Sequence, residues 1–144
     1  QVRLRVTGRI EDLPRSVRTE LERVMEATKA YTRWHLILAL SYGGRTEIMD
    51  AVRAIARKVK TGELEPEAVD ETVISRHLYL PDVPDPDLMI RTSGELRLSN
   101  FLLWELSYAE FYFTDTLWPD FREPQFAEAL AEYSRRQRRF GAPS

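Results

Sequence analysis

Arginine and glycine occur together at three points of the sequence, each directly after a short apolar run. The three clusters are Gly8-Arg9, Gly43-Gly44-Arg45 and the stretch from Arg91 to Arg97, which contains Gly94. Glycine lets the backbone approach a ligand closely, a following helix offers free N–H groups, and a guanidinium donates forked hydrogen bonds. Each cluster therefore has the composition of an anion site, and phosphate is the anion that this chemistry favours.

A simpler interpretation is adequate for any one cluster alone, because glycine also permits a tight turn while a nearby arginine lies in water. Three such clusters at one edge of a sheet favour the anion site instead. The two histidines, His35 and His77, have no neighbouring pattern of metal ligands. Metal binding by histidine is therefore not indicated.

The hydrophobic pattern alternates between strands and helices along the chain. We expect strands at 2–6, 34–40, 88–90 and 111–113, and helices that begin near Pro14, Thr46, Glu67, Ser99 or Asn100, and Pro124. This order predicts an α/β fold with a mostly parallel sheet flanked by helices, which binds ligands at the carboxyl ends of its strands. The length of 144 residues fits a single domain.

The same pattern predicts which segments are buried. The almost continuous apolar run from Trp34 to Leu40 is typical of a parallel strand buried on both faces. The helix that begins near Ser99 is expected to run through 101–106. The C-terminal helix is expected to bury Phe126, Leu130 and Tyr133.

Composition limits the function classes. The net charge is -2 and the pI about 5.8, so no overall positive field favours nucleic acid. The chain has no cysteine, which suits a reducing compartment, and we expect the cytoplasm. Because the first residue is Gln1 and a strand pattern begins at once, we expect a fragment or a processed product.

Four segments carry a resemblance to a known family. They are 91–104 (RTSGELRLSNFLLW), Tyr42 to Arg45 (YGGR), 108–121 (with YAE and LWPDF) and 138–141 (RRFG). In order and approximate spacing the chain resembles the C-terminal part of cis-prenyltransferases of the undecaprenyl or decaprenyl diphosphate synthase type. The fold that this resemblance implies is an incomplete cis-prenyltransferase fold, with 1–144 as the C-terminal part of one catalytic domain.

The resemblance implies roles for seven residues. The substrate-binding positions are Arg91, Arg97, Leu98, Ser99, Arg139 and Gly141. Of these, Arg91, Arg97 and Ser99 correspond to the residues that hold the diphosphate of isopentenyl diphosphate. Glu110 corresponds to a residue that helps to bind Mg²⁺, whereas from the sequence alone it is an ordinary exposed glutamate at the start of a strand. The ending with Arg139 and Gly141 is expected to reach across a homodimer interface.

The function implied by the resemblance is that of a Mg²⁺-dependent transferase in isoprenoid biosynthesis. It would condense isopentenyl diphosphate with an allylic prenyl diphosphate to form a cis-polyprenyl diphosphate, the precursor of a cell-wall lipid carrier. Mg²⁺ and arginines would stabilise the departing diphosphate. A homodimer in the cytoplasm, with a peripheral membrane contact for product release and no nucleic acid, is expected.

Two departures and two alternatives accompany this resemblance. The family's Asp-Gly-Asn motif has no match, so we expect no catalytic aspartate in 1–144 and no turnover by these residues alone. In addition, Leu96 stands where the family usually has a histidine or a polar residue. One alternative is a noncatalytic partner subunit of a heterodimer; the other is a generic phosphate-binding α/β domain. Trp34 either closes the floor of a product tunnel or packs against the preceding helix.

Overall fold

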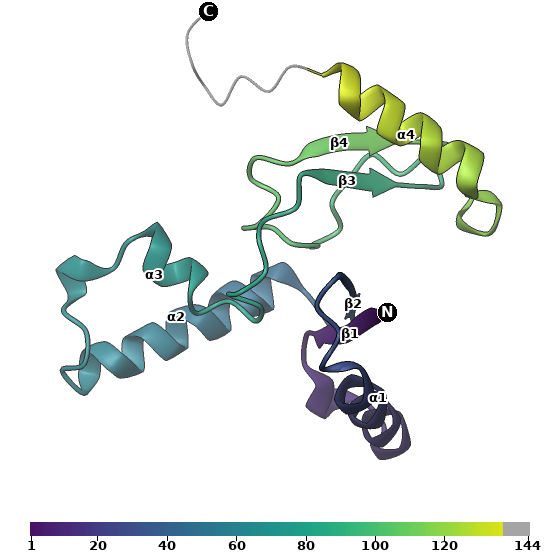
Figure 1. The fold of residues 1–144 in the computed structure, drawn as a ribbon. Helices are drawn as coiled ribbons and strands as arrows, with labels where there is room; N and C mark the ends of the chain where they lie inside the picture. The colour runs from purple at the N-terminus through teal and green to yellow at the C-terminus, as the bar shows by residue number, and fades with distance from the viewer. Residues whose placement is uncertain (137–144) are drawn as a thin grey trace, which may run out of the picture. The chain divides into compact units, whose positions relative to one another are not determined.

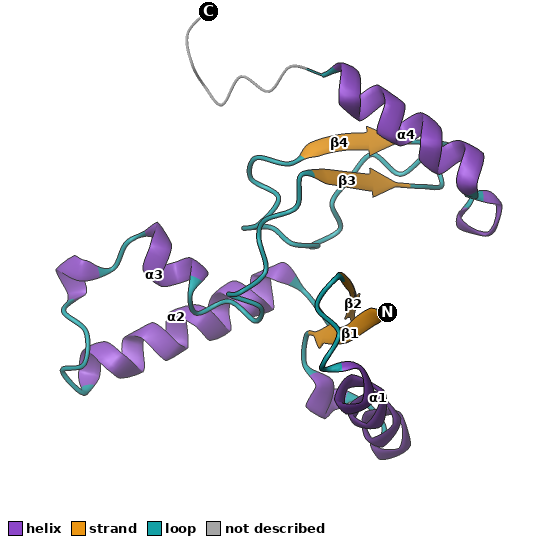
Figure 2. Ribbon diagram, viewed as in Figure 1, coloured by secondary structure: helices purple, strands orange, loops and turns teal. Residues whose placement is uncertain are grey.

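The computed structural model describes residues 1–136, in which short strands and helices alternate (Figures 1 and 2). In chain order the elements are β1 (Val2–Thr7), α1 (Arg15–Thr28), β2 (Trp34–Ala39), α2 (Gly44–Lys60), α3 (Glu71–Ser75), β3 (Leu88–Arg91), β4 (Glu110–Phe113) and α4 (Glu123–Arg135). The predicted α/β class and all four predicted strands are confirmed. Within this described part of the chain, no helix combines the length and the apolar character needed to cross a bilayer.

The described residues form two compact units, Gln1–Val83 and a second one that begins at Pro84, and each contains a two-stranded parallel sheet. In the first unit β1 pairs with β2 from Val2 opposite Trp34 to Thr7 opposite Ala39. In the second unit β3 pairs with β4 from Leu88 opposite Glu110 to Arg91 opposite Phe113. The expectation of a single domain stays a prediction.

The strand β2 is much more exposed than its apolar sequence predicts. Trp34 is 59% exposed and Leu36 is also exposed, so burial on both faces is wrong for this strand. Among the described residues β2 pairs with β1 alone, and a two-stranded parallel sheet covers little of its own surface. The Arg33 guanidinium lies 5.6 Å from the centre of the Trp34 ring, which gives the ring one cation–π contact.

The helix α1 packs on β1 through a hydroxyl as well as through apolar side chains. The Thr28 hydroxyl accepts a hydrogen bond from the Leu4 N–H at 3.0 Å and donates to the Val24 carbonyl at 2.8 Å. An edge strand exposes unpaired N–H groups. Thr28, the last residue of α1, therefore provides a hydrogen-bond acceptor for one backbone N–H group at the edge of β1.

The helix α2 begins three residues earlier than predicted, because its N-cap is Gly43 and not Thr46. A buried carboxylate, Glu47, which is only 2% exposed, fixes this start. It accepts hydrogen bonds from the Tyr42 hydroxyl and, at 2.9 Å, from the Tyr79 N–H. Because a buried carboxylate is costly without such donors, Glu47 ties the end of β2 to the segment that follows α3.

The segment predicted as a helix at 101–106 forms consecutive turns instead. The backbone has positive φ at Ser99 (51°), Asn100 (64°) and Leu102 (42°). Right-handed helix requires negative φ at every residue, so these three positions exclude it. The predicted helix at 67–75 is also shorter than expected, since a single 3-10 turn at Pro66–Ala68 precedes α3.

The helix α4 covers β4 with a different residue from those predicted. Ala129 is fully buried, whereas Phe126 and Leu130 are exposed and Tyr133 is half-buried. The small side chain of Ala129 lets the helix backbone approach the strand closely. Phe126 and Leu130 are 47% and 43% exposed, so residues 1–136 cover them only in part.

We predict that Gly8→Ala destabilises the fold by about 3 kcal/mol or more, because steric clash adds to left-handed strain. Gly8 has φ +110°, and an added Cβ would lie 2.1 Å from the Leu40 carbonyl oxygen. Chemical unfolding measures the loss. Gly62→Ala is the matched control, since Gly62 has φ +74° but no atom within 4 Å of an added Cβ. Equal losses for the two variants would contradict the clash.

A second prediction concerns Glu47. Glu47→Ala leaves the Tyr79 N–H without its acceptor, and we expect a loss of about 2–3 kcal/mol in the free energy of unfolding. Glu47→Gln retains an acceptor oxygen and should lose less. The exposed Glu67 provides the control, because Glu67→Ala should change stability by about 0.5 kcal/mol at most. A Glu47→Ala protein as stable as the Glu67→Ala control would show that the carboxylate does not hold this segment.

Candidate functional site

The carboxyl end of β3 continues into a turn that remains hydrogen-bonded to the segment after β4. The Arg91 carbonyl accepts from the Thr114 N–H at 3.0 Å. The Ser93 and Gly94 N–H groups donate to the carbonyls of Thr116 and Thr114, both at 2.9 Å. This backbone ladder fixes the loop that carries the predicted diphosphate-binding residues.

Glycine is favoured at position 94 of this loop. Gly94 has φ +66°, and an added Cβ would lie 3.0 Å from Oδ1 of Asp115. Ser93 precedes it with φ +68°, so two successive residues adopt the left-handed conformation. The loop therefore reverses direction sharply and returns toward β3.

Two of the predicted substrate-binding residues meet at this turn. The Arg91 guanidinium donates a hydrogen bond from Nη2 to the Ser99 hydroxyl at 3.1 Å, across eight residues of sequence. Ser99 was predicted to lie at a helix N-terminus. Its φ of 51° places it in a left-handed turn instead. Leu98 is half-buried and its carbonyl accepts from the Phe101 N–H at 3.2 Å, which gives it a place in the turn.

Arg97 has a different partner. Its guanidinium forms an ion pair with Oε2 of Glu95, a contact without the alignment of a hydrogen bond, and the Arg97 side chain is 67% exposed. The structure thus joins Arg91 to Ser99 and Arg97 to Glu95. Arg91 has no carboxylate partner within residues 1–136, so its charge is not neutralised by an acid of the described chain.

Glu110 lies at the opposite end of the same strand pair. It is the first residue of β4 and faces Leu88, the first residue of β3, whereas Arg91 ends β3 opposite Phe113. The three residues that separate Arg91 from Leu88 correspond to about 10 Å along a strand. The predicted metal ligand and the predicted diphosphate ligands therefore occupy different ends of the sheet.

The Glu110 carboxylate is bound through one oxygen by Arg136. Nη1 of Arg136 donates to Oε2 of Glu110 at 2.9 Å and to the Phe111 carbonyl at 2.7 Å, and Nη2 donates to Oε1 of Glu132. Glu132 and then Glu110 raise the pKa of the Arg136 guanidinium. Glu110 is therefore a held carboxylate and not the freely exposed glutamate that the sequence alone suggested.

Glu110 fits Mg²⁺ as a single ligand. Its Oε1 accepts no hydrogen bond from the described residues, and its side chain is 29% exposed, so one oxygen remains accessible. No group of three His, Asp or Glu residues that could hold a metal ion occurs in 1–136. Mg²⁺ commonly takes one or two carboxylates and completes its shell with phosphate oxygens and water. The residues present suit that arrangement and not an all-protein cage.

The other two arginine and glycine clusters lie together in the first unit, because β1 and β2 are parallel neighbours. There the Arg9 guanidinium is held by Asp50 at 3.2 Å, and Asp50 also accepts from the Tyr79 hydroxyl at 2.7 Å. The Tyr79 and Arg9 hydrogen bonds lower the pKa of Asp50, while burial and then Asp50 raise the pKa of Tyr79 to about 12. Arg9 is therefore held by a carboxylate of its own unit and does not simply lie in water, as the simpler interpretation of a single cluster had it.

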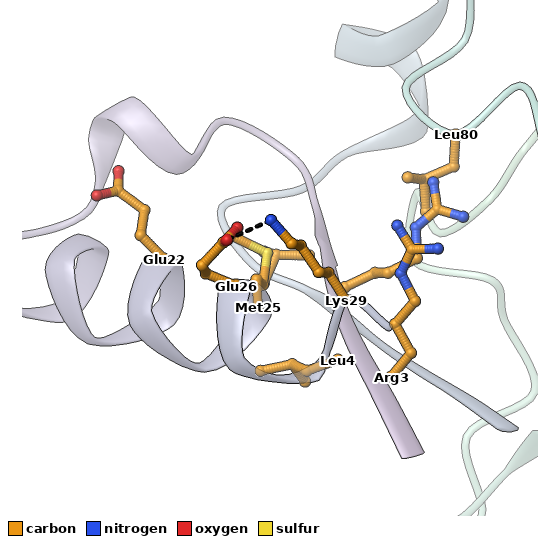
Figure 3. Close-up of a pocket in the computed structure, with 9 residues that line it drawn as sticks. Arg3, Leu4, Glu22, Met25, Glu26, Lys29 and Leu80 are labelled. Atoms are coloured by element: carbon orange, nitrogen blue, oxygen red, sulfur yellow. Dashed lines mark hydrogen bonds and ion pairs between the residues drawn. The ribbon is translucent and has the colours of Figure 1, made fainter. Parts of the chain in front are cut away.

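An open groove of about 640 Å³ follows the edge of β1 (Figure 3). Basic and acidic side chains share it with apolar ones; the lining residues are Arg3, Leu4, Arg5, Val6, Glu22, Met25, Glu26, Lys29 and Leu80. Two of its cations are already paired, Lys29 with Glu26 and Arg5 with Asp82 through two hydrogen bonds of 2.7 Å. Its charges are mostly satisfied, which makes it a weak anion site.

Sequence reasoning missed the role of Arg136. It belongs to a row of arginines at 135, 136, 138 and 139, and nothing in their spacing shows which one reaches β4. The predicted residues Arg139 and Gly141 lie outside the described residues.

Comparisons with known proteins identify the family of this chain. Residues 1–141 match the family model described as "Putative undecaprenyl diphosphate synthase". An isoprenyl transferase of Heliobacterium mobile is 53% identical over 140 residues, which cover 97% of this chain and 54% of that protein. A tritrans,polycis-undecaprenyl-diphosphate synthase (geranylgeranyl-diphosphate specific) of Methanocaldococcus jannaschii is 51% identical over 143 residues, or 98% of this chain and 51% of that protein.

Solved structures give the same result. The crystal structure of lavandulyl diphosphate synthase from Lavandula x intermedia, in complex with dimethylallyl diphosphate, superposes with a TM-score of 0.95 at 41% identity and covers 98% of this chain and 61% of its own. A probable undecaprenyl diphosphate synthase from Campylobacter jejuni gives 0.83 at 40% identity, with 98% and 64% covered. The chain spans about half the length of the curated relatives it matches. By sequence and by fold, it belongs to the undecaprenyl diphosphate synthase family of cis-prenyltransferases.

Proposed function

We propose that this chain serves an enzyme that condenses isopentenyl diphosphate with an allylic prenyl diphosphate and forms a cis-polyprenyl diphosphate. The observation that carries the proposal is the meeting of Arg91 and Ser99 at the carboxyl end of β3. A guanidinium without a carboxylate partner and a hydroxyl beside it are suitable donors for a diphosphate. Relatives named isoprenyl transferase and undecaprenyl-diphosphate synthase support the same reaction.

In this proposal Arg97 binds the same diphosphate by exchanging its partner. Its largely exposed side chain pairs with Oε2 of Glu95, a buried oxygen that accepts no aligned hydrogen bond from the described residues. A diphosphate, with several charged oxygens, offers a guanidinium a stronger bidentate contact. Arg139 and Gly141 would complete the site from the partner subunit of a homodimer.

Mg²⁺ is the cofactor of the proposed enzyme. It would supply charge stabilisation to the departing diphosphate, and Glu110 would offer it one carboxylate oxygen, Oε1. The chain's arginines would provide the remaining neutralisation of negative charge. The product is proposed to be the precursor of a cell-wall lipid carrier, made by a cytoplasmic enzyme that contacts a membrane only peripherally when it releases product.

The first test of the function is Arg97→Ala in the protein at its natural full length. We expect the KM for isopentenyl diphosphate to rise ten- to a hundredfold, about 1.5–3 kcal/mol for a charged hydrogen bond. Thermal stability should change little, because the side chain is largely exposed. Arg57→Ala, which removes an exposed arginine near the end of α2, is the control and should leave KM unchanged. Unchanged kinetics in Arg97→Ala would refute the assignment.

The second test concerns product length. Trp34 is 59% exposed, so the described residues do not bury it against the preceding helix, and we propose the tunnel-floor hypothesis for it. Trp34→Ala at natural full length should therefore lengthen the products, with little loss of thermal stability. Chromatography of the dephosphorylated products measures this. A fall in melting temperature with unchanged product length would instead identify Trp34 as a packing residue.

A further inference from the structure

Arg136 holds Glu110 from two fixed points. One is the backbone carbonyl of Phe111 in β4, at 2.7 Å from Nη1, and the other is the carboxylate of Glu132, one helical turn earlier in α4. A guanidinium is planar and rigid, so two anchors on different elements define its orientation. The third contact, from Nη1 to Oε2 of Glu110 at 2.9 Å, therefore fixes the Glu110 carboxylate as well.

The consequence for Glu110 is an asymmetric carboxylate. Oε2 is occupied by Arg136, and Oε1 has no hydrogen-bond partner among residues 1–136. A glutamate free in water must give up rotamer freedom to bind a ligand, and one that is already oriented does not. Carboxylates that bind metal ions are commonly hydrogen-bonded by outer residues that orient them in this manner.

The charges of this group still favour a cation. An isolated guanidinium beside Glu110 would repel Mg²⁺, but Glu132 compensates it. Two carboxylates and one guanidinium leave the group with a net charge of -1. Arg136 can therefore orient Glu110 without making the site repulsive to a divalent ion.

We propose that Arg136, anchored by Glu132 and the Phe111 carbonyl, is the positioning residue that presents Oε1 of Glu110 to the divalent metal ion. The proposal rests on the metal role of Glu110 in the proposed function. A purely structural role, in which Arg136 only fastens α4 to β4, predicts altered stability with an unaltered metal affinity. Metal affinity at constant fold is therefore the property that separates the two.

The experiment uses the protein at its natural full length and Mn²⁺ as a paramagnetic probe, titrated by electron paramagnetic resonance with and without inorganic diphosphate. Arg136→Gln should weaken Mn²⁺ binding about tenfold, the lower end of the effect of removing an orienting partner. Arg136→Lys keeps the charge but loses the fork, so it should also weaken binding. Arg135→Gln is the matched control, since the adjacent Arg135 is exposed and has no ion pair in the described part of the chain.

Two further variants make every outcome decisive. Glu110→Gln should weaken Mn²⁺ binding at least as much as Arg136→Gln; if it has no effect, the metal role of Glu110 fails and the positioning role with it. If Glu110→Gln weakens binding while Arg136→Gln and Arg136→Lys do not, the metal role stands and the positioning role is overturned. Should Arg136→Gln fail to fold, Arg136→Lys and Glu132→Gln, which removes one anchor, replace it, and unchanged Mn²⁺ affinity in both overturns the proposal.

Discussion

Parallel pairing of β3 with β4 is the constraint on which the candidate site depends. The pairing continues past the strand ends, where Ser93 and Gly94 donate to the segment after β4. Backbone N–H and C=O groups must be satisfied when they leave water, so the loop cannot move without the loss of several hydrogen bonds at once. This backbone ladder fixes the position of Arg91, and the position of Arg91 in turn allows its contact with Ser99.

The same pairing separates two kinds of chemistry. Because the strands are parallel and in register, Glu110 lies at the end where β3 begins, and Arg91 at the end where it finishes. Neither side chain can be oriented by the other over about 10 Å of strand. Each end therefore has its own fixing contact, the Ser99 hydroxyl at one and the Arg136 guanidinium at the other.

Local sequence predicted the strands well and the irregular backbone poorly. Strands are short apolar runs bounded by glycine and proline, and that signal is direct. Ser99-Asn100 also has the composition of a helix N-cap, yet asparagine and, less often, serine adopt the left-handed conformation found here. Periodicity shows which face is apolar and not what covers it, which is why the exposure of Trp34 and Phe126 was not predicted. Family resemblance placed Arg91 and Ser99 at one diphosphate site, but neither the resemblance nor the spacing predicted the direct hydrogen bond between them.

The arginine-rich composition indicates an anion site only where a guanidinium has no carboxylate partner. Three arginines, Arg5, Arg9 and Arg136, each bind a carboxylate and so hold two segments of their unit together. The paired acid neutralises the charge of each guanidinium. Among residues 1–136, Arg91 binds a neutral hydroxyl and no carboxylate, which orients the guanidinium without neutralising it. An oriented and uncompensated cation attracts an anion more strongly than one already paired with an acid. Of Arg9 and Arg91, which both lie in arginine and glycine clusters, Arg91 at the end of β3 is therefore the one whose physical state suits a diphosphate.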